Sequence, residues 1–198
     1  MASRFTRVTS NAVLLPAADV DTDQIIPARF LKITTRDGLA EHLFSEWRYD
    51  AGGAPRPEFA LNRPEAAGAS ILIAGHNFGC GSSREHAAWA LVGWGLRAVI
   101  ASSFADIFRS NAIVNGLVPV ELGRAEHARL VAAREAEPGL PVTVDLERQV
   151  VEWADQAIEF SIDPFSRRCL LDGTDALGYL LSLEPAIAAH EARKSGGE

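Results

Sequence analysis

The sequence predicts an α/β fold with mostly parallel central strands, an antiparallel pair and a C-terminal helix. Apolar strand segments alternate with helical segments between residues 70 and 122, which favours parallel strands joined by right-handed crossovers. Apolar and polar residues alternate between Val142 and Ile162, as in two short antiparallel strands. A chain of 198 residues suits one well-buried domain, so we expect residues 1–198 to form a single domain.

The N-terminal part of the chain begins with a strand. We expect this strand to run from Phe5 to Leu15 and to end at Pro16 and the acidic turn Asp19 to Asp23. The polar residues from Lys32 to Gly38 are expected to be mobile, and Leu39 to Trp47 has the apolar spacing of a helix.

The middle of the chain carries the α/β pattern. Residues 50 to 69 are rich in Gly, Pro and Ala and predict a long surface loop. The apolar run Ser70 to Ala74 predicts a strand buried on both faces. A glycine-rich loop then leads to a helix from about Arg84 to Trp94. Three more segments follow: a strand from Leu96 to Ala101, a helix from Phe104 to Asn115 with Gly116 as its C-cap, and a strand from Leu117 to Leu122.

The C-terminal part adds two helices to the antiparallel pair. Ala125 to Glu137 predicts a helix that ends at Pro138-Gly139. Ala176 to Ala189 predicts an amphipathic closing helix, with Thr174 or Asp175 as its N-cap. We expect residues 190–198 to be a frayed tail.

Charge and hydropathy exclude several classes of function. The net charge of −7, from 19 basic and 26 acidic residues, argues against binding to nucleic acid, because basic side chains supply most of that affinity. No run approaches the roughly 18 apolar residues that span a bilayer, so no membrane association is expected. A secretory signal is not supported, because the apolar stretch Ala12 to Leu15 is short. The basic, acid-free first 18 residues leave an organelle-transit sequence open as an alternative to a cytoplasmic location.

The two cysteines, Cys80 and Cys169, point to a reducing compartment without a disulfide framework. Two thiols also fall short of the roughly four that hold an iron–sulfur cluster, so the chain is expected to bind no metal by itself. Cys80 raises a nucleophile hypothesis, because a thiol near a helix N-terminus can have a lowered pKa. Cys169 is expected to be a small buried residue of a helix.

The most informative stretch is Gly75 to Trp89, G-H-N-F-G-C-G-S-S-R-E-H-A-A-W. Its glycines allow close approach of a ligand, and the N-terminus of the following helix favours an anion. Arg84 adds a planar fork suited to a carboxylate, so the motif indicates carboxylate binding. A purely structural alternative stays open, because Ser82 and Glu85 have the spacing of a capping box. The loop lacks the lysine of a phosphate-binding P-loop.

The stretch Asn77 to Ala87 resembles the signature of the swivelling domain in the aconitase superfamily. Its form with Cys80 is similar to that of the isopropylmalate dehydratase small subunits. Further segments resemble that family in the same order, and the resemblance covers essentially the whole chain. These segments are Asp21 to Leu31, Ser103 to Phe108 with Asn111 and Gly116-Leu117, and Phe165 with Cys169 to Leu171 and Gly173. The fold that the resemblance implies is a single swivelling β/α domain.

This resemblance also implies roles for individual residues. Ser82, as an alkoxide, would remove a proton from a substrate carbon, and Ser83 would orient the substrate or complete the pocket. Arg84 and Arg29 would bind substrate carboxylates, although a surface salt bridge is the alternative for each. Asp23 would pair with catalytic neighbours, or belong only to an acidic turn. The loop near the cluster of another chain would contain Gly79, Cys80 and Gly81.

The activity implied by the resemblance is that of a hydro-lyase subunit. It would isomerise 2-isopropylmalate to 3-isopropylmalate in leucine biosynthesis, by dehydration of a small dicarboxylate and rehydration at the adjacent carbon. The [4Fe–4S] cluster would lie on a large iron–sulfur subunit, without which this chain would be inactive. Two alternatives stay open: a homoaconitate or methylmalate-type substrate, selected through Leu31 to Arg36, and a non-catalytic, thiol-regulated adaptor.

Overall fold

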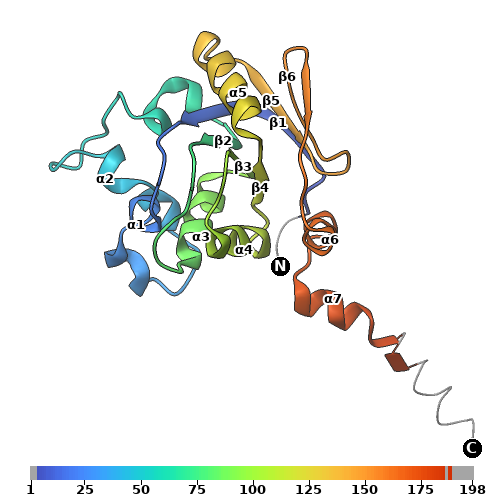
Figure 1. Ribbon diagram of the computed structural model, residues 1–198. Helices are drawn as coiled ribbons and strands as arrows, with labels where there is room; N and C mark the ends of the chain where they lie inside the picture. Colours follow the sequence, from blue (N-terminus) through green and yellow to red (C-terminus); the bar gives the residue numbers. More distant parts are fainter. Residues whose placement is uncertain (1–3, 186, 189–198) are drawn as a thin grey trace, which may run out of the picture.

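A seven-stranded mixed sheet organises the computed structural model, which describes residues 4–185, 187 and 188 (Figure 1). The spatial order of the strands is β4-β3-β2-β1-β5-β6-β7. Their bounds are β1 Arg7–Leu15, β2 Ile71–Ala74, β3 Ala98–Ala101, β4 Val118–Glu121, β5 Pro141–Asp145, β6 Val150–Trp153 and β7 Gln156–Glu159.

Strand β1 joins a parallel half of the sheet to an antiparallel half. Its second part, residues 12–15, pairs in parallel with β2, and β3 and β4 continue this parallel half. Its first part, residues 7–11, pairs with β5 in antiparallel fashion, followed by β6 and β7. The predicted α/β class and parallel centre are therefore confirmed.

Helices cover both faces of this sheet. Figure 1 shows α3 and α4 together on one side of the strands and α5 on the opposite side. The helices are α1 Thr22–Ile25, α2 Ser45–Arg48, α3 Glu85–Trp94, α4 Asp106–Val114, α5 Arg124–Ala136, α6 Pro164–Asp172 and α7 Ala176–Ser182. Short 3-10 helices lie at η1 Ala28–Lys32, η2 Leu39–His42, η3 Ala60–Asn62 and η4 Pro64–Ala66.

The central strands are buried on both faces, so the molecule has one apolar core on each side of the sheet. Leu72 and Val99 face the core that contains Leu91 of α3 and Phe108 of α4. Their neighbours along each strand face the second core, which contains Leu130 of α5. This double burial explains why these strands are continuous apolar runs in the sequence.

The predicted antiparallel pair is wrong in number, because residues 142 to 162 contain parts of three strands, β5, β6 and β7. The connection between β6 and β7 is a two-residue turn at Ala154 and Asp155, with Trp153 opposite Gln156. Ala154 has φ of 47°, a conformation that glycine or asparagine usually adopts in such turns. Because neither residue occurs here, the sequence gives no signal for this turn.

The predicted helix from Leu39 to Trp47 is also wrong. The segment forms η2 and α2, separated by Phe44, which has φ of 49° and is fully buried. The Phe44 N–H donates to Ile25 O at 2.8 Å, and its ring stacks on Trp47 with centroids 5.7 Å apart. Contacts with residues distant in sequence thus override the local helical spacing at this point.

Residues 50 to 69, predicted as a surface loop, are exposed almost throughout their first part and at several positions of their second part. The second part forms η3 and η4 and buries Leu61, Ala66 and Ala69 in the core that contains α3. The predicted strand and helix positions between residues 70 and 137 agree with β2, α3, β3, α4, β4 and α5.

The C-terminal region contains α6, which the sequence analysis did not delimit, and α7, whose predicted end lies beyond the described residues. Cys169 is buried in α6, as expected for a small helix residue. Helix α7 begins after Asp175, whose side chain accepts from Gly178 N, and the helix ends at Ser182. The predicted end at Ala189 and the expected frayed tail, residues 190–198, lie outside the described residues.

No helix in the described part of the chain combines the length and the apolar character needed to cross a membrane.

Candidate active site

Three loops meet at the carboxyl edge of the parallel strands: residues 16–21 after β1, 75–84 after β2 and 102–105 after β3. In open α/β sheets this edge is the usual place for a ligand. The middle loop carries the glycine-rich motif, so its position at this edge agrees with a functional site.

Backbone hydrogen bonds fix the middle loop on both sides. Toward the first loop, Gly79 N donates to Val20 O and Thr22 N donates to Cys80 O, both at 2.8 Å. Toward the third loop, Phe78 exchanges two hydrogen bonds of 3.1 Å with Ser103 and Ala105. The loop is therefore held like an additional strand between its neighbours, and its conformation is defined before any ligand binds.

Glycine is required at two positions of this loop. Gly79 has φ of 78°, and a Cβ there would lie 2.2 Å from Phe108 Cγ. Gly81 has φ of 88°, and a Cβ there would lie 2.1 Å from an Asp21 carboxylate oxygen. Both the backbone conformation and the absence of space exclude a side chain, so these glycines allow the loop to lie directly against α4 and the turn before α1.

The turn before α1 contains a complete capping box. Asp21 is the N-cap, and its carboxylate accepts from Asp23 N at 2.6 Å. In return, the Asp21 N–H donates to Gln24 Oε1 at 2.8 Å. These local bonds satisfy the free N–H groups at the start of α1 and hold Asp23 in its first turn.

Arg84 forms an ion pair with Asp23. The guanidinium donates from Nη1 to Asp23 Oδ1, and the same oxygen accepts from Ala28 N at 3.2 Å. The Arg84 side chain is only 12% exposed, so its orientation is defined, whereas the Asp23 carboxylate is 51% exposed. The hydrogen bond from Arg84 is the main reason why the pKa of Asp23 lies below its ordinary value. The structure thus brings together two of the predicted site residues, which are 61 positions apart.

Ser82 and Ser83 are exposed beside this pair. Within the described residues, neither hydroxyl makes a hydrogen bond. The Ser82 backbone is nevertheless fixed, because Thr22 Oγ1 donates to Ser82 O at 3.0 Å. The hydroxyl of Ser82 is therefore free to meet a substrate, while the backbone that carries it is held in place.

The capping-box alternative for Ser82 is wrong. Helix α3 begins at Glu85, its N-cap is Arg84, and the cap makes no side-chain hydrogen bond. Glu85 does not turn back to Ser82, because its Oε1 accepts from Asn115 Nδ2 at 2.9 Å and from Trp89 Nε1 at 3.2 Å. Both serines precede the helix.

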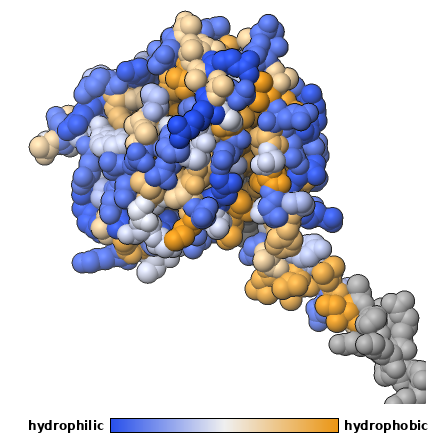
Figure 2. All heavy atoms as spheres, in the orientation of Figure 1, coloured by the Kyte–Doolittle hydropathy of each residue, from blue (hydrophilic) through white to orange (hydrophobic). Residues whose placement is uncertain are grey.

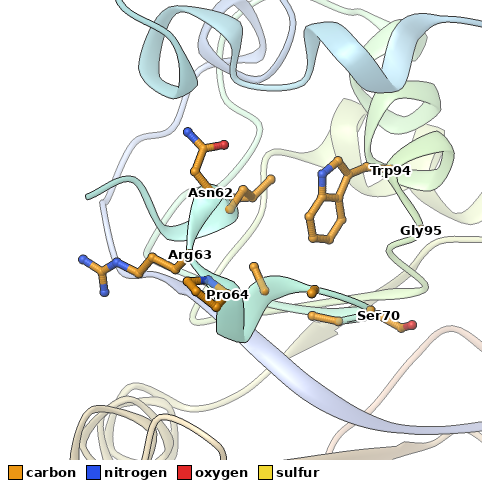
Figure 3. A pocket seen from close by; sticks show the side chains of 11 residues that line it. Asn62, Arg63, Pro64, Ser70, Trp94 and Gly95 are labelled. Atoms are coloured by element: carbon orange, nitrogen blue, oxygen red, sulfur yellow. The ribbon is translucent and has the colours of Figure 1, made fainter. Parts of the chain in front are cut away.

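A cavity of about 510 Å³ lies elsewhere (Figure 3). It is lined by Asn62, Arg63, Ser70 and Trp94, among others. Ser70 directly precedes β2, so this cavity lies at the amino edge of the parallel strands, opposite the glycine-rich loop. The residues that line this cavity do not belong to the glycine-rich loop, where Ser82 and Ser83 are exposed.

Comparison with known proteins decides the family. The aconitase C-terminal domain model matches residues 2–125, and the LeuD_N model matches residues 128–164. The 3-isopropylmalate dehydratase small subunit of Chloroflexus aurantiacus is 58% identical over 186 residues, which are 93% of this chain and 92% of that protein. The chain belongs to the family of 3-isopropylmalate dehydratase small subunits.

Two further members of this family agree. The 3-isopropylmalate dehydratase small subunit of Anaeromyxobacter dehalogenans is 60% identical over 93% of this chain and 95% of that protein. The crystal structure of 3-isopropylmalate dehydratase (leuD) from Methanocaldococcus jannaschii superposes with a TM-score of 0.68 at 30% identity. It covers 93% of this chain and 99% of that chain, so the aconitase-type fold is confirmed over nearly the whole small subunit.

Arg29 is not part of the Arg84–Asp23 pair in this small subunit. Its Nη1 donates to Glu46 Oε1 at 2.6 Å, and both side chains are more than half exposed. The backbone next to it does reach the pair, because Ala28 N donates to Asp23. Arg29 therefore lies near the site, with its guanidinium directed to a carboxylate of the same chain.

Cys80 lacks the properties of a nucleophile. Its half-buried Sγ donates to Asp19 O at 3.3 Å. Burial, followed by the charges of Asp21 and Asp19, raises the pKa of this thiol, whereas a nucleophile requires a lowered pKa. Among the residues that the structure describes, no three His, Cys, Asp or Glu side chains gather as they would around a metal ion. The side chains of this part of the chain do not fit an iron–sulfur cluster.

Several residues that support the site were missed in the sequence. Thr22 and Gln24 hold the loop and the turn, and Asn115 with Trp89 engages Glu85. The D-x-x-Q spacing of a capping box could have identified Gln24, but no local signal links Thr22 to Ser82 or Asn115 to Glu85.

Proposed function

We propose that this chain supplies the general base and a carboxylate-binding arginine to the isomerisation of 2-isopropylmalate to 3-isopropylmalate, a step of leucine biosynthesis. The observation that carries the proposal is the exposed, unengaged Ser82 hydroxyl on a fixed loop beside the oriented Arg84 guanidinium. Membership of the 3-isopropylmalate dehydratase small-subunit family supports the choice of substrate.

Arg84 would hold a substrate carboxylate. Asp23 occupies one terminal nitrogen of its guanidinium, and among the described residues Nε and Nη2 have no partner in the chain. These two nitrogens form one edge of the planar fork and match the two oxygens of a carboxylate. Asp23 would then orient Arg84 from the opposite edge while the substrate is bound. For Arg29 to bind a second carboxylate, it would have to leave Glu46.

Ser82 would act on the substrate carbon. As an alkoxide its Oγ would accept a proton from that carbon, the electron pair would form a C=C bond, and the hydroxyl on the neighbouring carbon would leave as hydroxide. The proton taken up by Ser82 and this hydroxide together make up the water that is lost. Rehydration reverses these steps, with water added at the other carbon. The positive charge of Arg84 would stabilise the alkoxide, because a free serine is far too weak a base. Ser83 would orient the substrate, and Gly79, Cys80 and Gly81 would face the cluster of the partner.

The partner would be a large subunit with a [4Fe–4S] cluster, which supplies Lewis-acid assistance to the leaving hydroxyl. The chain has two cysteines, fewer than the roughly four thiolates that hold such a cluster, which supports placing the cluster on the partner. We also propose that residues 1–198 act as one swivelling domain, supported by the single sheet that spans both matched regions.

We propose a cytoplasmic location for the chain. The two free cysteines support it, because they suit a reducing compartment.

Reconstitution tests this function. The chain and its large subunit are co-purified without oxygen and assayed on 2-isopropylmalate, homoaconitate and a methyl-substituted malate. We expect the highest kcat/KM on 2-isopropylmalate and no turnover by either chain alone. Arg84→Lys keeps the charge but loses the two-pronged geometry, so its kcat/KM should fall by at least about 100-fold. A higher kcat/KM on another diacid would reassign the substrate, and a normal Arg84→Lys enzyme would remove the proposed role of Arg84.

A further inference from the structure

An apolar surface extends over helices α4, α6 and α7, outside the site described above. It consists of large apolar side chains that are 44% to 64% exposed: Ile107 and Val114 on α4, Phe165 on α6, and Leu177, Leu180 and Leu181 on α7. We refer to these six residues as the α4–α7 surface. Exposed apolar groups of this size gathered on adjoining helices are typical of a surface that another protein covers.

The three helices of this surface are packed together at one point. A cavity of about 180 Å³ is lined by Val114 of α4, Phe165 and Cys169 of α6, and Ala176 of α7. The Phe165 ring also meets Tyr179 edge-on, with centroids 5.2 Å apart. The start of α7 is therefore anchored to the body of the molecule.

The rest of α7 leaves the body. Figure 1 shows it directed away from the sheet, and Figure 2 shows apolar residues gathered over it, in contrast to the mostly hydrophilic face beside it. Residues 176 to 183 contain no charged side chain, and Leu177 and Leu181 lie one turn apart on the same side of the helix. A helix that exposes leucines to solvent without packing them on the core of its own chain indicates that another protein covers them.

The other end of the surface reaches the candidate active site. Ile107 lies in the first turn of α4, next to Phe108, and Phe108 packs directly under Gly79 of the catalytic loop. The Ala105 N–H, just before α4, donates to Phe78 O of the same loop. The α4–α7 surface is therefore continuous with the edge that a second subunit must cover to complete the site.

We propose that the α4–α7 surface is the docking surface for the large subunit and that α7 packs against that subunit as an extended arm. This inference rests on the proposed function. A second copy of this chain fits less well. Seated over Ile107, it would cover the surface beside Phe108 and Gly79 and so exclude from it the subunit that carries the cluster. The large subunit, in contrast, would bury the apolar surface and face Ser82 in a single complex.

Binding measurements test this inference with a matched pair of variants. Leu177→Asp/Leu181→Asp places two charges one turn apart on α7, and Ala128→Asp/Ala132→Asp places two charges one turn apart on the exposed side of α5. The Kd for the large subunit is measured for both, for Ile107→Asp and for the parent chain, together with thermal unfolding of each isolated chain.

We expect the α7 double variant and Ile107→Asp to raise the Kd at least about 100-fold with unchanged unfolding temperature, because charge is excluded from the core of an apolar interface. The α5 control should bind like the parent, and saturating large subunit should restore the parent kcat to the α7 variant. Parent-like affinity in the α7 variant would overturn the inference, as would a parent chain that does not bind. The inference would also be overturned if the α7 variant lost only its association with a second copy of the chain and kept the parent Kd for the large subunit. Tight binding by the parent without isomerase activity would instead contradict the proposed function.

Discussion

Two turns at the edge of the sheet carry the same sequence pattern but fold differently. Asp21 to Gln24 and Ser82 to Glu85 both have a capping residue followed three positions later by Gln or Glu. In the first turn the pattern forms a complete capping box. In the second turn no side chain caps the helix, and the two residues that should pair have other partners or none.

The difference shows how the site is divided between structure and chemistry. The first turn is held by its own local hydrogen bonds, and it in turn holds the second through Thr22 and Asp23. The second turn is supported only by distant residues, so Ser82 is released from a structural task and remains available to a substrate. Four predictions test this difference between the two turns.

The first prediction replaces Ser82 by Ala or Asn. If Ser82 is the base, reconstituted isomerase activity should fall at least about 10³-fold in both variants, comparable to the loss of a general base. Because Ser82 caps nothing, the free energy of unfolding of the isolated chain should stay within about 0.5 kcal/mol of the parent. Activity of Ser82→Asn near the parent rate would move the base to another residue, with Ser83 the first candidate.

The second prediction concerns contact between the two turns. Gly81→Ala should destabilise the chain by at least about 2 kcal/mol, from backbone strain at positive φ and displacement of the Asp21 cap. Gly53→Ala is the matched control, since Gly53 has φ of 83° and no atom within 4 Å of a Cβ placed there. Its cost should be only the strain, about 1 kcal/mol. Equal losses in denaturant unfolding would show that the contact with Asp21 is unimportant.

The third prediction removes the cap of the first turn. Asp21→Ala should cost about 0.5–2 kcal/mol in free energy of unfolding, whereas Asp21→Asn should retain most of it, because an amide oxygen also accepts from the helix N–H groups. Asp21→Ala should therefore be less stable than Ser82→Ala. The opposite order of stability would mean that the two turns have exchanged their roles.

The last prediction concerns pH. The pKa of Asp23 is lowered by Arg84, so the folded chain binds fewer protons than the unfolded chain near the ordinary value of 3.8. The contribution of the pair is present above this pH and is lost as the pH falls toward the lowered pKa. Because Asp23 is half exposed, we expect no more than about 0.5 kcal/mol. Urea unfolding between pH 5 and pH 3 should show a steeper decline for the parent than for Asp23→Asn; parallel curves would contradict it.

The α/β class, the succession of central strands and helices along the chain, and the family could all be predicted from the sequence alone. Apolar runs such as Ser70 to Ala74 and turn residues such as Gly116 are local signals, and they agree with the strands and helices observed. The glycine-rich loop was equally legible, because Gly79 and Gly81 are needed by backbone geometry that few other residues adopt.

The interruption of the predicted helix at Phe44 and the hydrogen-bond partners of the site residues depend on the tertiary structure. Phe44 interrupts a helical pattern because burial of its ring outweighs local propensity. Glu85 bonds Asn115 across 30 positions, Arg84 bonds Asp23 across 61, and Arg29 is directed to Glu46. No local pattern in the sequence identifies the partner in each of these pairs, because their free energy depends on distances between segments that are close only after the sheet has brought the loops together.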